Sequence, residues 1–102
     1  MKLMTQELEK KFPRLYETEN LKSSEIKVIT KYFHPLSIYT WYATEYDPKQ
    51  KLFFGYVIGH DSELGYFSLE EMESIEVKGL KIERDLYWKE CTLEDVMSGK
   101  SK

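Results

Sequence analysis

The chain lacks most of the features from which a function can be inferred directly. Its 102 residues include a single cysteine, Cys91, so no intramolecular disulfide can form. No apolar run approaches the roughly 20 residues that a membrane-spanning helix needs, and the first residues lack the apolar stretch of a signal peptide. We therefore expect a cytoplasmic protein that does not act on a membrane.

Motifs for catalysis and cofactor binding are missing as well. The sequence has no glycine-rich phosphate loop, no Cys/His spacing typical of a metal site and no nucleophile elbow. These absences favour a protein that is not an enzyme and that binds no cofactor.

Positive charge is scarce in one stretch. The net charge is −3, and residues 61–76 hold six acidic side chains and no lysine or arginine. A surface that binds nucleic acid needs cations to neutralise phosphates, so we expect no nucleic-acid partner. The fractions of charged residues (32%) and hydrophobic residues (41%) are those of a globular protein, and the length predicts one domain over residues 1–102.

Aromatic residues, at 15% of the chain, are the most unusual component. Aromatic rings suit half-buried sheet surfaces and interfaces, because each buries a large area with few rotatable bonds. We expect core packing on one face of a sheet and a protein-contact patch on the other. The predicted partner-binding residues are Trp41, Tyr42, Tyr46, Tyr56 and Tyr66.

Alternation and turn signals predict a mainly β fold. Thr5 and Pro13 delimit a short helix over residues 6–11, and the polar residues 17–24 indicate a loop. Period-two patterns predict strands, among them a hairpin around the turn 47–50. The expected strands are 25–33, 38–47, 52–59 and 64–67, with an edge strand over 82–89. On one side of the third strand Gly55 and Gly59 leave room, most simply for an aromatic ring such as Trp41, alternatively for a ligand.

Helix-start signals follow the fourth strand. Ser68 and Glu71 form the pattern of a capping box, with Phe67 and Met72 as a hydrophobic staple, which predicts a helix over 69–75. A last helical turn is expected from Thr92, and residues 98–102 are expected to fray. The predicted fold class is α+β: a small twisted antiparallel sheet of about four strands with short helices packed on one face.

A set of charged residues supplies the alternative hypothesis, a metal-dependent hydrolase or nuclease. Such a site needs two or more carboxylates that converge on a metal ion. The metal-ligand candidates are Glu45, Glu63 and Asp85, and the wider catalytic set adds His60 and Arg84. The simpler interpretation is that Arg84 pairs with a carboxylate such as Glu63 or Glu45, and that His60 is an exposed loop histidine.

Several segments together resemble a known family. These are Leu3-Met4-Thr5, residues 15–19, 40–45, 53–55 and 63–69, and Glu83-Arg84-Asp85. Over residues 3–95 the chain resembles the bacterial domain of unknown function 2958, whose members tend to be encoded on plasmids and integrative elements. The resemblance implies a role in the biology of mobile DNA and points to the polar positions Glu45, Glu63, Arg84 and Asp85. The leading hypothesis is a regulatory or interaction module that binds a protein through an aromatic face with an acidic rim.

Overall fold

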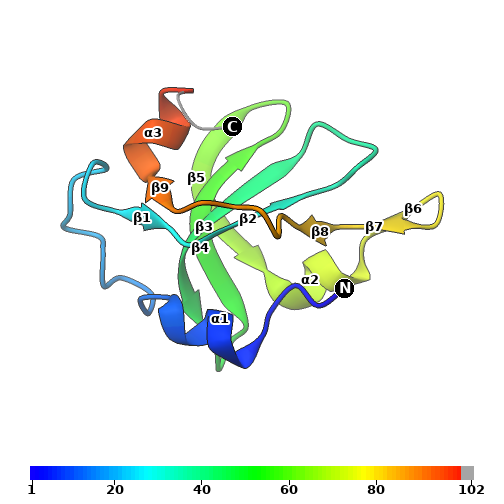
Figure 1. The fold of residues 1–102 in the computed structure, drawn as a ribbon, viewed down its shortest axis with the longest axis horizontal. Coiled ribbons are helices and arrows are strands. Elements are labelled where there is room, and N and C mark those ends of the chain that lie inside the picture. Colours follow the sequence, from blue (N-terminus) through cyan, green and yellow to red (C-terminus); the bar gives the residue numbers. More distant parts are fainter. Residues whose placement is uncertain (100–102) are drawn as a thin grey trace.

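A five-stranded antiparallel sheet forms the centre of the computed structural model, which describes residues 1–99 (Figure 1). The strand order is β5-β4-β3-β2-β8. Its strands are β2 (Thr30–Phe33), β3 (Thr40–Asp47), β4 (Leu52–Ile58), β5 (Ser62–Ser68) and β8 (Glu83–Arg84). The small α+β fold built on an antiparallel sheet is therefore confirmed.

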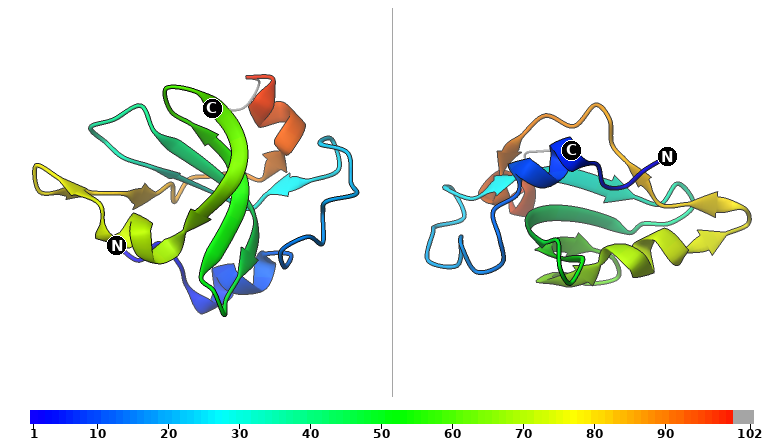
Figure 2. Two further views of the ribbon diagram at one scale, coloured as in Figure 1. Left: turned by 180° about the vertical axis from the view of Figure 1, so that it is seen from behind. Right: turned by 90° about the horizontal axis from the view of Figure 1, so that it is seen from below.

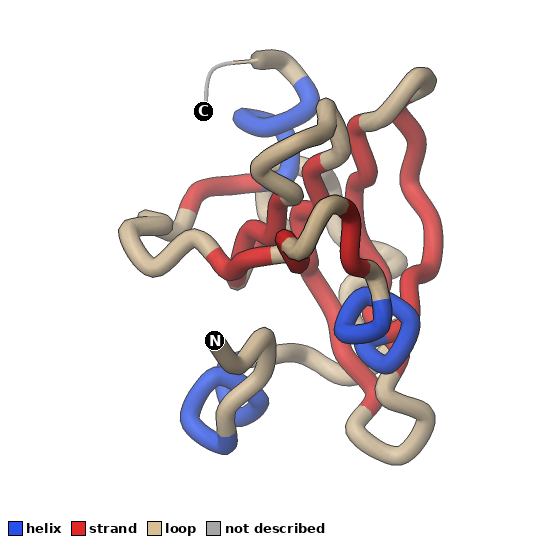
Figure 3. The backbone as a smooth tube through the Cα atoms, turned by 90° about the vertical axis from the view of Figure 1, so that its right-hand side faces the viewer, coloured by secondary structure: helices blue, strands red, loops and turns tan. Residues whose placement is uncertain are grey.

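Two short strand pairs and three short helices surround this sheet. Strand β1 (Lys27–Val28) pairs with β9 (Cys91–Thr92), and β6 (Glu76–Val77) pairs with β7 (Leu80–Lys81) in a hairpin that projects from the body in both views of Figure 2. The helices α1 (Gln6–Lys11), α2 (Leu69–Ser74) and α3 (Leu93–Met97) lie at the periphery (Figure 3). None of the helices in residues 1–99 is long and apolar enough to cross a membrane.

Side-chain caps start the helices where the sequence predicts. Thr5 accepts a hydrogen bond from the Leu8 amide at 3.1 Å, and Ser68 accepts one from the Glu71 amide at 3.2 Å. Both residues of the predicted staple, Phe67 and Met72, are buried. The reciprocal capping box forms at α3, where Thr92 and Asp95 each bond the other's backbone amide.

Two of the predicted strands are shorter or divided. The chain 25–33 breaks at Ile29, whose amide donates to the Ala43 carbonyl at 2.9 Å, so β1 and β2 join different sheets. The edge strand 82–89 ends at Arg84, because Asp85 then accepts a hydrogen bond from the Tyr87 amide and turns the chain away. At the end of the described chain, Ser98 and Gly99 still donate to α3 carbonyls; the rest of the expected tail, 100–102, lies outside the described residues.

Two buried clusters lie on opposite faces of the sheet. The first face carries Ala43, Tyr46 and Phe53, and the N-terminal segment and α2 cover it. The second face carries Tyr42 and Tyr56, and α3 covers part of it through Leu93 and Val96. The helices therefore serve both faces, because successive strand residues point to opposite sides and both sides carry apolar side chains.

A β-bulge at Thr44 determines which residues of β3 reach each face. The pairing with β4 shifts between Ala43 and Glu45, which leaves Thr44 as the extra residue. After the bulge Tyr46 pairs with Phe53 on the first face, and Glu45 pairs with Phe54 on the second face. Regular alternation would have placed these two side chains the other way round.

Gly55 and Gly59, the two glycines of the predicted strand 52–59, are each required because another group approaches their Cα closely. A Cβ on Gly55 would lie 1.9 Å from the Tyr42 carbonyl oxygen, so the neighbouring backbone itself occupies that space. A Cβ on Gly59 would lie 2.4 Å from the Tyr39 ring. The expected aromatic ring is thus present at Gly59, but it belongs to Tyr39, on which Trp41 stacks at 5.9 Å between ring centroids.

Candidate functional site

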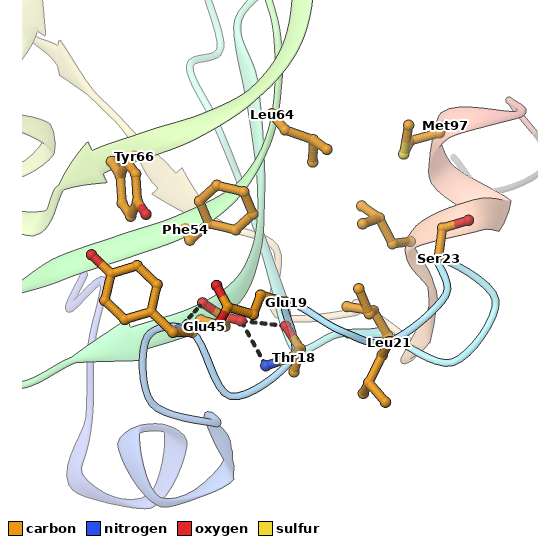
Figure 4. A pocket seen from close by; sticks show the side chains of 12 residues that line it. Thr18, Glu19, Leu21, Ser23, Glu45, Phe54, Leu64, Tyr66 and Met97 are labelled. Carbon is orange, nitrogen blue, oxygen red and sulfur yellow. Dashed lines mark hydrogen bonds between the residues drawn. The ribbon is translucent and has the colours of Figure 1, made fainter.

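A groove of about 360 Å³ opens on the second face of the sheet (Figure 4). Its floor is one cross-strand row, Glu45–Phe54–Tyr66, contributed by β3, β4 and β5. The loop before β1 forms one wall, and α3 contributes the far end. Its lining residues are Tyr16, Thr18, Glu19, Leu21, Ser23, Ile26, Glu45, Phe54, Leu64, Tyr66, Leu93 and Met97.

The carboxylate of Glu45 holds the loop wall in place. Glu45 is only 3% exposed, and its two oxygens accept hydrogen bonds from the Tyr16 amide (2.9 Å), the Thr18 amide (3.0 Å) and the Thr18 hydroxyl. All of these donors are uncharged. Within residues 1–99 the one ion pair joins Lys31 to Asp85, so Glu45 has a buried carboxylate without a cationic partner there.

Tyr16 adopts a conformation that is rare for an aromatic residue. Its φ of 73° lies in the left-handed region, which costs about 1–2 kcal/mol for a residue with a Cβ. The hydrogen bond from its amide to Glu45 offsets part of this cost. The side chain stays 60% exposed at the mouth of the groove. Strained backbone of this kind is typical of functional sites.

Tyr66 lies on the same side of the groove as Glu45 (Figure 4), and it shares a side-chain hydrogen bond with Tyr16, which also lines the groove. A side-chain hydrogen bond with Tyr16 raises the pKa of Tyr66, and the negative charges of Glu45 and Glu19 raise it further. The ring of Phe54 meets that of Tyr66 edge to face, with centroids 5.1 Å apart. This end of the groove is therefore both aromatic and electronegative.

The catalytic candidates from the sequence do not come together. Arg84, Tyr32, Trp41, Val57 and Glu63 form a single cross-strand row, with Arg84 and Glu63 at opposite edges of the sheet. Four strand spacings separate their backbones by about 19 Å. The row lies on the first face, whereas Glu45 lies on the second, so neither Glu63 nor Glu45 pairs with Arg84. Its buried Nε has no hydrogen-bond partner among residues 1–99.

The remaining two catalytic candidates, Asp85 and His60, lie apart from Glu45, Glu63 and Arg84 and from each other. Asp85 pairs with Lys31 at 4.0 Å beside β2. His60 is exposed in the turn between β4 and β5, and its ring stands perpendicular to that of Tyr39. In the described part of the chain no three His, Cys, Asp or Glu side chains are placed to hold a metal ion together. The proposed ligands Glu45, Glu63 and Asp85 therefore form no common site.

The predicted partner-binding aromatics divide into three groups. Tyr42 and Tyr46 are buried core residues, so the prediction that they contact a partner is corrected: Tyr46 is turned inward by the bulge, and Tyr42 is covered by Trp88. Trp41 and Tyr56 are half-buried. Tyr66 is 52% exposed and lies in the groove.

Trp41 belongs to a second, smaller pocket of about 270 Å³, which the β2–β3 connection, β3 and the residues at the start of β6 form together. Its walls are apolar except for Ser37 and His34. The Nδ1 of His34 accepts a hydrogen bond from the Leu36 amide at 3.1 Å, so Nε2 carries the proton and donates to the Leu80 carbonyl at 3.0 Å. Both ring nitrogens of His34 are thus engaged in holding the pocket together.

Sequence reasoning missed the loop residues of the groove, Tyr16, Thr18 and Glu19. The segment 17–24 indicated a polar loop, and nothing in its spacing places it against a carboxylate 27 residues away in the chain. The available signal was the Tyr16–Glu19 segment, which contributes to the family resemblance.

The comparisons with known proteins show the family of the chain and do not indicate an activity. A family model described as "Protein of unknown function (DUF2958)" matches residues 3–95. No curated protein and no solved structure matches the chain.

Proposed function

This chain belongs to the DUF2958 family of proteins of unknown function, and we propose that it is a non-enzymatic module that binds a protein partner in the groove above Glu45, Phe54 and Tyr66. The proposal extends to its setting: a cytoplasmic regulatory protein of mobile genetic elements. The setting rests on the resemblance described above, and the binding role rests on the groove.

The observation that carries the proposal is the groove's exposed aromatic and aliphatic lining on a rigid support. Tyr16, Leu64 and Tyr66 are 60%, 45% and 52% exposed, yet each is fixed by a strand or by the Glu45 hydrogen bonds. Tyrosine is enriched at protein interfaces, because it supplies a large contact area at low entropic cost. A preformed groove loses little conformational freedom when a partner binds.

The charge of the groove supports a protein partner over a nucleic acid. Among residues 1–99, its lining includes Glu19 and Glu45 and no lysine, arginine or histidine. Two carboxylates repel phosphates, and nucleic-acid binding needs cations in contact with the backbone. The metal-dependent hydrolase is not favoured by any observation on the described residues, since its carboxylates point from different faces and edges of the sheet.

Site-specific photo-crosslinking tests this proposal. A photoreactive benzoylphenylalanine at Leu64, in the groove, is compared with the same group at Leu86, which is 61% exposed and lines none of the described pockets. We expect a defined protein, identified by mass spectrometry, to crosslink from position 64 and not from position 86. Tyr66→Ala in the same background should weaken that crosslink. Identical products from both positions, or products that Tyr66→Ala leaves unchanged, would contradict the proposal.

A further inference from the structure

The two ends of the groove differ in chemistry. Figure 4 shows Glu19, Glu45 and Tyr66 at one end, with Leu21, Leu64 and Met97 toward the other. Tyr16 belongs to the first end, because its side chain is hydrogen-bonded to that of Tyr66. We propose that the first end, the acidic end, binds the cationic side chain of an arginine or lysine of the partner, while the apolar end holds a neighbouring apolar side chain. This inference rests on the proposed function and specifies what the groove recognises.

The first argument is the uncompensated carboxylate. Glu45 is almost wholly buried and accepts hydrogen bonds from two amides and a hydroxyl, none of which carries charge. An ionised carboxylate offers about four acceptor sites, so one remains open after these three bonds. Burying a charge is costly unless it is paired. A cation brought by a ligand would supply the pairing that residues 1–99 do not provide.

The second argument is the arrangement of the rings. Tyr66 is hydrogen-bonded to Tyr16 and lies close enough to Glu45 and Glu19 for their charges to act on it, and Phe54 packs edge to face against Tyr66. The face of an aromatic ring attracts ammonium and guanidinium groups through its quadrupole. Aromatic rings beside carboxylates therefore suit an organic cation better than a hydrated metal ion, which would need more oxygen ligands than this site has.

The third argument is the negative potential at the mouth of the groove. The hydrogen bond with Tyr16, burial and the electrostatic effect of Tyr16 raise the pKa of Tyr66 most, and the charges of Glu45 and Glu19 add to this rise. The potential that disfavours a tyrosinate favours a cation at the same place. Glu19 contributes from the exposed rim, where its charge also attracts an approaching basic side chain.

The apolar end of the groove indicates that the ligand is a segment of a protein rather than a free cation. Leu21, Leu64 and Met97 are each a little under half exposed, and they continue the groove beyond the acidic end. A metal ion or a small ammonium compound would leave this surface uncovered. An apolar side chain close to a basic one in a peptide covers both ends at once.

A matched pair of peptides tests the inference. The probes are acetyl-Leu-Ala-Arg-Ala-Leu-amide and the same peptide with citrulline, the uncharged isostere of arginine, and backbone amide NMR follows the binding of each. We expect saturable shifts at Glu45, Leu64 and Tyr66 with the arginine peptide, and binding about tenfold weaker with the citrulline peptide. Equal affinity of the two peptides, or shifts confined to other surfaces, would overturn the inference.

Charge variants localise the effect. Glu19→Gln should bring the affinity for the arginine peptide toward that of the citrulline peptide, because it removes a groove charge without touching the Glu45 hydrogen bonds. Glu70→Gln, on the exposed side of α2 outside the groove, makes the same change in net charge and should leave both affinities unaltered. If both variants weaken binding equally, the charge preference belongs to the whole molecule and the inference fails.

The outcome also separates this inference from the proposed function. If the arginine and citrulline peptides bind equally and Tyr66→Ala abolishes both, the groove is a protein-binding site without the cation preference. If neither peptide shifts the groove residues and the crosslink from position 64 is absent, both proposals fail.

Discussion

The two faces of the sheet use aromatic residues in opposite ways. On the first face Phe53 is fully buried and contacts four other rings: Phe12, Tyr32, Tyr46 and Phe67. On the second face Phe54, one residue further along β4, forms the floor of an open groove with Tyr66. Aromatic content alone therefore does not mark an interface. A ring on a covered face stabilises the core, whereas a ring on an open face is available to a partner.

Truncation of Phe53 should have the largest effect on stability. Phe53→Ala leaves a cavity among four rings, which costs about 3–5 kcal/mol of unfolding free energy. Urea denaturation measures this loss. Phe54→Ala is the matched control and should cost clearly less, since that side chain is only partly buried. Equal losses at positions 53 and 54 would show that the two faces are packed alike.

Removal of the Glu45 carboxylate should release the loop wall of the groove. Glu45→Ala leaves the Tyr16 and Thr18 donors without their acceptor, at a cost of about 1–3 kcal/mol. We expect faster hydrogen exchange at the amides of residues 16 and 18, measured by NMR. Glu63→Ala, on an exposed strand position, should leave those exchange rates unchanged. Unchanged rates in Glu45→Ala would mean that other contacts hold the loop.

Alkaline pH should lower the unfolding free energy through Tyr32, a buried residue of the first face. Burial raises the pKa of Tyr32 well above its ordinary value of 10, although the nearby positive charge of Arg84 opposes this. A pKa that is higher in the folded state gives stability that is complete below pH 10 and is lost as pH rises toward the folded pKa. Unfolding free energies measured from pH 8 upward should therefore fall above pH 10. In Tyr32→Phe this fall should be smaller; an unaltered pH profile would exclude Tyr32 as its source.

Substitution of Tyr66 should have the smallest effect on stability. Tyr66→Ala removes an exposed ring on the second face and should change the unfolding free energy by less than about 1 kcal/mol. Crosslinking from position 64 should nevertheless decrease strongly. A loss of stability as large as that of Phe53→Ala would show that Tyr66 belongs to the core.

The pKa of Tyr66 should fall in the variant Tyr16→Phe, because that variant removes the hydrogen bond that raises this pKa. Ultraviolet titration measures the change.

Local signals predicted much of the fold and little of the site. The first helix, with its Thr5 cap, and the start of α2 at Ser68 follow from interactions within a few residues, and the sequence shows them directly. The hairpin of β3 and β4 follows from alternation and a turn around Pro48. The groove depends on contacts between Glu45 and a loop some 27 residues earlier in the chain, for which the sequence has no local pattern.

The sequence by itself determined the caps, the main hairpin, the α+β class and the family, because each depends on neighbouring residues or on a linear pattern. Only the tertiary structure decided which side chains face the groove. The bulge at Thr44 sends Tyr46 into the core and Glu45 to the second face, reversing the assignment that strict alternation predicts. The physical reason is that a bulge is set by how two strands pair across the sheet, and a single strand's sequence does not specify its partner's register.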